Sequence, residues 1–139
     1  HVFTANASYV REWQKLNYTF GSLAAADHRK NTLDQFRAAV SYHYRQTWGA
    51  SVGAFDARTS TDVTLNGGNG RLNTAGYIIQ GDWTPWGKES SPGAPWANVR
   101  LGAQYTGYTR YEGASTNYDG AGRNARDNNT LMLFLWTAI

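Results

Sequence analysis

The sequence predicts an all-β protein: an antiparallel up-and-down β-barrel that crosses a membrane, with about seven to eight strands visible as part of a larger barrel. Three features predict this class. Stretches of strand length alternate apolar and polar side chains, the connections alternate between short and long, and the chain closes on an apolar stretch. Residues 1–139 are expected to form one barrel domain or the carboxyl-terminal segment of a barrel.

The closing stretch, residues 129–139, reads NTLMLFLWTAI. Its length of about eleven residues is that of one tilted strand across a bilayer. Both of its faces carry large apolar side chains, because three leucines alternate with Met132, Phe134 and Trp136. Outer-membrane barrels close on such a strand, with alternate side chains facing lipid. The alternative is a buried closing strand of a soluble sandwich or small barrel.

Period-two alternation predicts six earlier strands. They are expected at residues 1–10, 15–23, 32–45, 48–56, 76–86 and 96–111. The stretch 32–45 is the clearest, because Phe36, Val40 and Tyr42 share one face and Arg37 lies on the other. The resulting count is odd, whereas bacterial single-chain barrels have an even number of strands. Either an amino-terminal part is missing or a strand lies unrecognised at residues 59–65.

The connections between these stretches alternate in length. The shorter set lies at residues 11–14, 46–47 and 87–95, and the longer set at residues 24–31, 57–74 and 112–128. Outer-membrane barrels have short periplasmic turns and long outer loops, so we assign the shorter set and the carboxyl terminus to the periplasmic end. Aromatic rings favour the membrane interface, and this threading places all six tryptophans in one belt at that end. They are Trp13, Trp48, Trp83, Trp86, Trp96 and Trp136.

The composition agrees with a barrel and excludes several other classes. Charged residues make up only 17% of the chain, which is low for a soluble domain of average composition. The absence of Cys removes disulfides, thiolate metal sites and covalent haem attachment. The net charge of +3 is too small and too scattered to indicate nucleic-acid binding.

No catalytic, metal or cofactor site is predicted. His1, His28 and His43 lie far apart in the sequence and lack the spacing of metal ligands. The chain contains no nucleophile motif of the G-x-S-x-G kind. We therefore expect a protein that is not an enzyme and that carries no cofactor.

Residues 81–139 contain the segments GDWTPWGKESS, PWANVRLGAQYTGYTRY and NYDGAGRNARDNNTLMLFLWTAI. This part of the chain resembles the carboxyl-terminal end of large proteobacterial outer-membrane barrels of the porin-like kind. The resemblance implies a location in the bacterial outer membrane and insertion through the last strand by the assembly machinery there. Terminal strands of this kind usually end in Phe or Trp, and Ile139 departs from that pattern.

The two faces of the strands are assigned opposite surroundings. The predicted lipid-facing set comprises Val40, Tyr42, Val52, Ile79, Val99, Leu101, Leu133 and Leu135. The predicted lumen-facing set comprises Lys15, Arg37, Arg45, Gln80, Asp82, Arg100, Gln104 and Arg110. A water-filled channel lined by cationic side chains favours anions. The alternative is that these cations pair with carboxylates of missing strands or of a plug.

Three functions are consistent with this pattern. The first is an outer-membrane pore or the barrel sheath of a larger complex, whose partners are the bilayer, small solutes or ions, and further strands or subunits. The second is a soluble small barrel that binds an apolar ligand between inward-facing apolar side chains. The third is a surface anchor or adhesive protein that acts through its loops.

Overall fold

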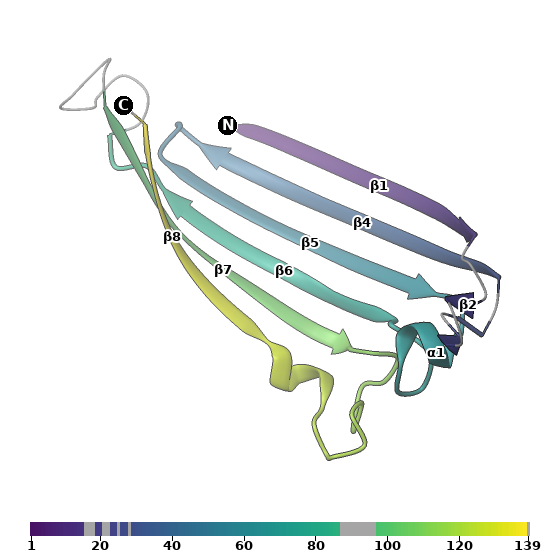
Figure 1. Ribbon diagram of the computed structural model, residues 1–139. Helices are drawn as coiled ribbons and strands as arrows, with labels where there is room; N and C mark the ends of the chain where they lie inside the picture. The colour runs from purple at the N-terminus through teal and green to yellow at the C-terminus, as the bar shows by residue number, and fades with distance from the viewer. Residues whose placement is uncertain (16–18, 21–22, 25, 28, 87–96, 139) are drawn as a thin grey trace.

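The computed structural model describes residues 1–15, 19–20, 23–24, 26–27, 29–86 and 97–138. Within them, six strands form one antiparallel sheet in the order β1-β4-β5-β6-β7-β8 (Figure 1). The strands are β1 (Val2–Lys15), β4 (Lys30–Tyr44), β5 (Trp48–Thr59), β6 (Thr74–Trp83), β7 (Asn98–Arg110) and β8 (Thr130–Ala138). A separate two-stranded sheet pairs β2 (Thr19–Phe20) with β3 (Leu23–Ala24).

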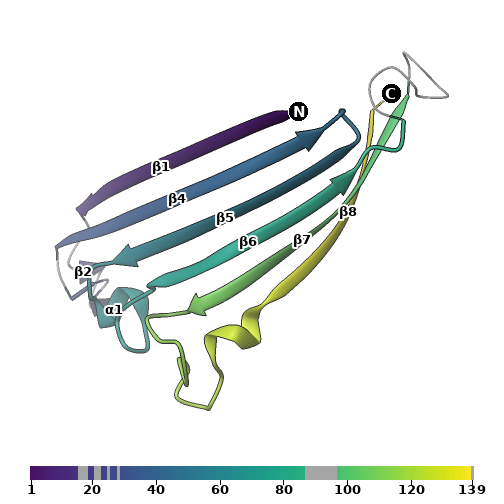
Figure 2. The same cartoon turned by 180° about the vertical axis from the view of Figure 1, so that it is seen from behind.

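The prediction of an all-β, up-and-down antiparallel fold is confirmed. The strands predicted at 32–45, 48–56, 76–86, 96–111 and 129–139 correspond to β4 to β8. The start of β1 and the end of β8 lie at one end of the sheet, and the long connections lie at the other (Figures 1 and 2). The sheet is open, since β1 and β8 are its two edges among the described residues.

The predicted turn at 11–14 is wrong. The strand predicted at 15–23 is contradicted where it is described, because Lys15 belongs to β1 and residues 19–20 pair with residues 23–24 in the small sheet. Residues 16–18 and 21–22 lie outside the described residues. Strand β1 continues to Lys15, and its pairing with β4 is unbroken through Trp13 opposite Thr32 and Lys15 opposite Lys30. A polar stretch stays in a strand when a partner strand satisfies its backbone groups, and β4 does so here. The main sheet therefore has six described strands, and the odd count that suggested a missing strand does not hold.

The proposal of an additional strand at 59–65 is also wrong. Thr59 ends β5, and the short helix α1 (Val63–Asn66) follows. The carboxylate of Asp62 accepts a hydrogen bond of 2.8 Å from the backbone amide of Leu65, the arrangement of a helix N-cap. The long connection between β7 and β8 contains a second short helix, η1 (Ala125–Asn128).

Aromatic rings lie over glycines on neighbouring strands. A Cβ atom added at Gly102 would collide with the ring of Phe134, and one added at Gly107 would collide with the ring of Tyr77. A ring placed over a glycine on a neighbouring strand holds the pairing register. One irregularity interrupts the pairing of β6 with β7 between Ala75 and Gly76.

The sheet has almost no buried core. Among the described residues, the buried apolar side chains are those of Ala26, Ala75 and Ala125. A soluble domain of this length normally buries many large apolar side chains in close-packed contact. Here the large apolar side chains are exposed on the sheet, so they need a covering that the described residues do not supply.

Candidate functional site

One face of the sheet, here called the apolar face, carries the aliphatic side chains. The register brings Val40, Val52, Ile79, Tyr105 and Leu131 into one row across five strands. Val52 is 55% exposed and Leu131 is 66% exposed. A contiguous exposed apolar surface of this extent marks a site of interaction with a partner or a membrane.

The apolar face has two distinct ends. At the end where β8 finishes, the rings of Trp48 and Trp83 stack with their centroids 5.6 Å apart. At the other end, Asp34 and Asp56 replace the apolar side chains. Asp56 follows Trp48 by eight positions in β5, which corresponds to about 27 Å of strand. At the usual barrel tilt of about 40°, the band between them is about 21 Å tall, close to the apolar band of outer-membrane barrels.

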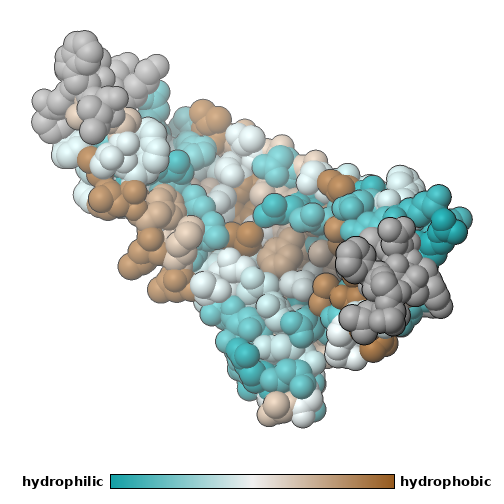
Figure 3. Space-filling model, viewed as in Figure 1, coloured by the Kyte–Doolittle hydropathy of each residue, from teal (hydrophilic) through white to brown (hydrophobic). Residues whose placement is uncertain are grey.

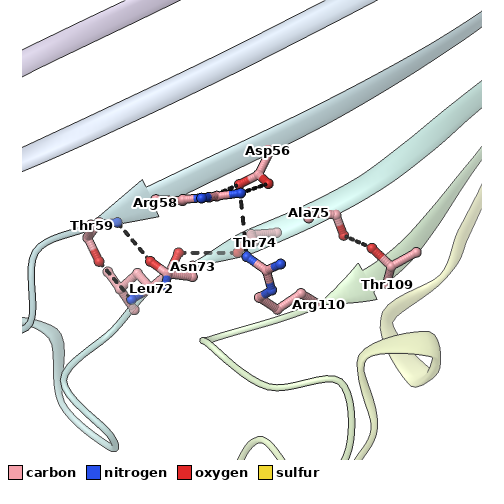
Figure 4. Close-up of polar contacts among 9 residues, drawn as sticks. All are labelled: Asp56, Arg58, Thr59, Leu72, Asn73, Thr74, Ala75, Thr109 and Arg110. Carbon is pink, nitrogen blue, oxygen red and sulfur yellow. Dashed lines mark hydrogen bonds and ion pairs between the residues drawn. The ribbon is translucent and has the colours of Figure 1, made fainter.

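Charged side chains cross the apolar face at the long-connection end. Arg58 donates two hydrogen bonds to Asp56, at 3.0 and 2.9 Å, and Arg110 lies 4.0 Å from the same carboxylate (Figure 4). Farther along, Arg11 lies 3.4 Å from Asp34. Asp34, Asp56 and Arg58, together with the rings of Tyr9 and Phe36, line an open hollow of about 380 Å³. These charges border the apolar band at the long-connection end of the sheet.

The opposite face, here called the polar face, is lined mainly by small and polar side chains, with the half-buried Phe55 and Ile78 among them. Ser41, Ser51, Gln80 and Gln104 form one row in register. On the same face, nearer the end of the sheet where β8 finishes, Arg100 donates hydrogen bonds of 2.9 and 2.7 Å to Asp82. The carboxylate of Asp82 occupies the space that a side chain at position 49 would fill, because that residue is glycine.

Five predicted lumen residues lie on the polar face: Arg37, Gln80, Asp82, Arg100 and Gln104. The eight residues predicted to face lipid share the apolar face. The grouping of both sets is therefore confirmed for these residues. Their surroundings, lipid on one side and a pore on the other, stay predictions.

The predicted direction of three other lumen residues is wrong. Lys15 shares the apolar face with Trp13, because β1 continues through the expected turn. Arg45 lies in the turn after β4 with a positive φ of 46°, and its guanidinium lies 5.3 Å from the centroid of the Tyr44 ring. Arg110 is turned to the apolar face, toward Asp56, by the irregular pairing beside Ala75.

The predicted single belt of tryptophans is also wrong. Trp48, Trp83 and Trp136 lie at the carboxyl-terminal end of the sheet, and Trp86 follows β6 there. Trp13 lies at the opposite end, because β1 reaches the long connections. Trp136 pairs with Arg100 and so belongs to the polar face. Trp96 and the predicted turn at 87–95 lie outside the described residues.

Strand β8 differs from the other strands on the polar face. It presents Met132, Phe134 and Trp136 there, in register with Gln104, Gly102 and Arg100. Figure 3 shows hydrophobic surface gathered along the β8 edge and hydrophilic surface at the long-connection end. Both sides of β8 are therefore apolar.

The connections at the long-connection end are joined to one another. Asp27 accepts hydrogen bonds from the backbone amides of Val63 and Thr64, at 2.5 and 3.2 Å, and from the Thr64 hydroxyl. In return, the carboxylate of Asp62 accepts a hydrogen bond of 2.9 Å from the backbone amide of Asp27. The Asn69 side chain donates a hydrogen bond of 2.9 Å to the backbone carbonyl of Glu112. This bond joins the connection between β5 and β6 to the connection between β7 and β8.

Our predictions from the sequence did not include the charged border of the apolar face. A signal for it exists: Asp56 and Arg58 continue the even-numbered series of Trp48 and Val52 along β5, and Arg11 continues the odd-numbered series of β1. Ending the predicted strands at residues 10 and 56 separated Arg11 and Arg58 from the face to which they belong.

Within the described part of the chain, no three His, Cys, Asp or Glu side chains lie where they could hold a metal ion. The helices described there are all too short or too polar to cross a membrane. Comparison with protein-family models, with curated proteins and with solved structures gives no match to this chain.

Proposed function

We propose that this chain is the membrane-spanning segment of a bacterial outer-membrane β-barrel, which acts as a pore or as the sheath of a larger complex. The observation that carries the proposal is the exposed apolar band. It extends about 27 Å along β5, it is bordered by stacked tryptophans at one end and by charges at the other, and no described element covers it. At the strand tilt usual in barrels, this length would span about 21 Å of a bilayer. Lipid would cover such a band.

The open edges support completion by further strands. A strand edge in a bilayer must satisfy its backbone groups, since no water is present to do so. Among the described residues, β1 and β8 each have one unpaired edge. We propose that additional strands or subunits pair with these edges and close the barrel. The resemblance of residues 81–139 to porin-like barrels agrees with this placement.

The polar face is the proposed lining of the lumen. It combines hydroxyl and amide side chains with the paired Asp82 and Arg100. A soluble barrel for an apolar ligand would need the opposite arrangement, with the aliphatic row turned into an enclosed interior. That row is instead the more exposed of the two faces, as the outer side of a curved sheet would be.

The absence of Cys allows a direct test with single-cysteine variants. Ser51 and Val52 are adjacent in β5 and lie on opposite faces. After folding into phosphatidylcholine vesicles, Val52→Cys should resist a water-soluble maleimide, and a fluorophore placed there should be quenched by brominated lipid. Ser51→Cys should react with the maleimide and escape the quencher.

Equal labelling and equal quenching at the two positions would remove the lipid-facing side. The unmodified chain supplies the companion measurement. It should require detergent to stay monodisperse, and a monodisperse solution without detergent would favour the soluble ligand-binding barrel.

A further inference from the structure

A group of cationic side chains lies on the apolar face beyond the apolar band. This group, here called the cationic rim, comprises Arg11, Lys15, Lys30, Arg58 and Arg110. The described carboxylates on the same border are Asp34 and Asp56. Positive charge is therefore in excess along this border.

The two carboxylates are already engaged by arginines. Asp34 lies beside Arg11, and Asp56 is shared by Arg58 and Arg110. None of the ion pairs found in the described residues involves Lys15 or Lys30. Both lysines are exposed and lie directly opposite each other in the register. Like charges in that position repel, so an anion between them would stabilise the pair.

An aromatic ring accompanies the cations. Trp13 is 73% exposed on the same face as Lys15, and the guanidinium of Arg11 lies 5.5 Å from its ring centroid. Tryptophan favours the level of lipid headgroups, where its apolar body and its N–H group are both satisfied. Cations at that level attract anionic lipids.

We propose that the cationic rim binds the phosphate groups of anionic lipids, with Lys15 and Lys30 as its principal contacts. The proposal rests on the proposed function, because the rim meets headgroups only if the apolar band lies in a bilayer. The occupant is a lipid phosphate because the rim continues the face that lipid tails would cover. It is not a pocket that encloses a free ion.

The test compares vesicles of phosphatidylcholine alone with vesicles that also contain phosphatidylglycerol. Each cation near an anionic surface contributes about a fivefold factor to association. The double variant Lys15→Gln/Lys30→Gln should therefore associate with the anionic vesicles about 25-fold more weakly. Its association with the neutral vesicles should be unchanged, which also shows that the variant still folds.

The matched control, Arg123→Gln/Arg126→Gln, removes the same charge from the connection between β7 and β8. It should keep most of the association with anionic vesicles. An equal loss in the control, or no loss in the lysine variant, would overturn the proposal. Inorganic phosphate should compete no better than chloride at equal ionic strength, and stronger competition would indicate a site for the free ion instead.

The outcomes separate this inference from the proposed function. If the unmodified chain associates equally with both kinds of vesicle, the cationic rim does not bind lipid phosphates, and the proposal of a membrane-spanning barrel is unaffected. If it associates with neither, the proposed function fails.

Discussion

Arg100 on β7 and Asp82 on β6 form a two-bond ion pair across the polar face. The guanidinium donates from Nη2 to Oδ1 at 2.7 Å and from Nε to Oδ2 at 2.9 Å. The Asp82 side chain is 8% exposed, whereas that of Arg100 is 39% exposed. The pair therefore satisfies a nearly buried carboxylate with a partner that still reaches solvent.

Replacing Arg100 should destabilise the sheet by removing two hydrogen-bond donors from that carboxylate. We expect Arg100→Gln to lower the free energy of unfolding by about 1–3 kcal/mol. The double variant Arg100→Gln/Asp82→Asn should recover part of the loss, because neither remaining group is charged. Urea unfolding of the folded chain in vesicles measures both, and strictly additive losses would mean that the pair does not act as a unit.

Arg37 differs from Arg100, since it is exposed on the polar face and forms none of the ion pairs found among the described residues. If the polar face lines a pore, Arg37 is a cation of the lining that none of the described ion pairs neutralises. Arg37→Glu should shift the reversal potential under a salt gradient from anion toward cation preference. The neighbouring change Ala38→Glu, on the apolar face, should instead impair folding into the bilayer, and an unshifted potential for Arg37→Glu would remove this residue from the lining.

Ile79 and Gln80 are adjacent in β6 and lie on opposite faces, and Ile79 is opposite Val52, midway between the tryptophans and the charges. A charge at the bilayer midplane on the lipid-facing side of a barrel costs about 2–4 kcal/mol, whereas lumen substitutions are tolerated. Ile79→Arg should therefore reduce the yield of folding into vesicles sharply, and Gln80→Arg should leave it largely intact. Electrophoretic mobility of the unboiled protein reports the folded fraction. Equal tolerance of the two changes would contradict the assignment of the faces.

Two glycines of the sheet offer a matched test of the aromatic packing. A side chain at Gly102 would collide with the ring of Phe134, whereas nothing lies within 4 Å of a Cβ atom at Gly81. Gly102→Ala should destabilise the sheet by about 1–3 kcal/mol through overpacking. Gly81→Ala should be neutral or stabilise it by up to about 1 kcal/mol, because it restricts the unfolded chain.

Combining Gly102→Ala with Phe134→Leu should relieve the collision and recover stability. Thermal unfolding of the four proteins, including the unmodified chain, gives the comparison. A loss at position 81 as large as that at position 102 would show that strand glycines matter here for some reason other than ring packing.

Asp27 makes one contact of the long connections dependent on pH. The hydroxyl of Thr64 and then the backbone amides of Thr64 and Val63 hold the pKa of Asp27 below the ordinary aspartate value. The stabilisation is present above the pKa of the unfolded chain and is lost as the pH falls through the lowered value. Protection of the Val63 and Thr64 amides from hydrogen exchange, corrected for intrinsic rates, should fall over that acidic range. Asp27→Asn should lack the transition, and pH-independent protection in the unmodified chain would contradict the assignment.

Local alternation was enough to predict most of the strands. The apolar and polar series of β4, β5 and β7 are complete within each strand, and each side chain points opposite to its neighbours whatever strand lies beside it. The sequence also contained the cue to the missed charged border, since Asp56 and Arg58 keep the spacing of the apolar series. A change of residue type was mistaken there for the end of a strand.

The sequence by itself determined the class of fold, the strands β4 to β8 and the chemical contrast between the two faces, because a period of two is a property of the strand alone. The tertiary structure decided what depends on a partner. Pairing with β4 keeps residues 11–15 in β1, which moves Trp13 to the far end and Lys15 to the apolar face. The irregular pairing with β6 turns Arg110 toward Asp56. Hydrogen bonding between strands sets continuity and register, and those bonds join residues far apart in the chain.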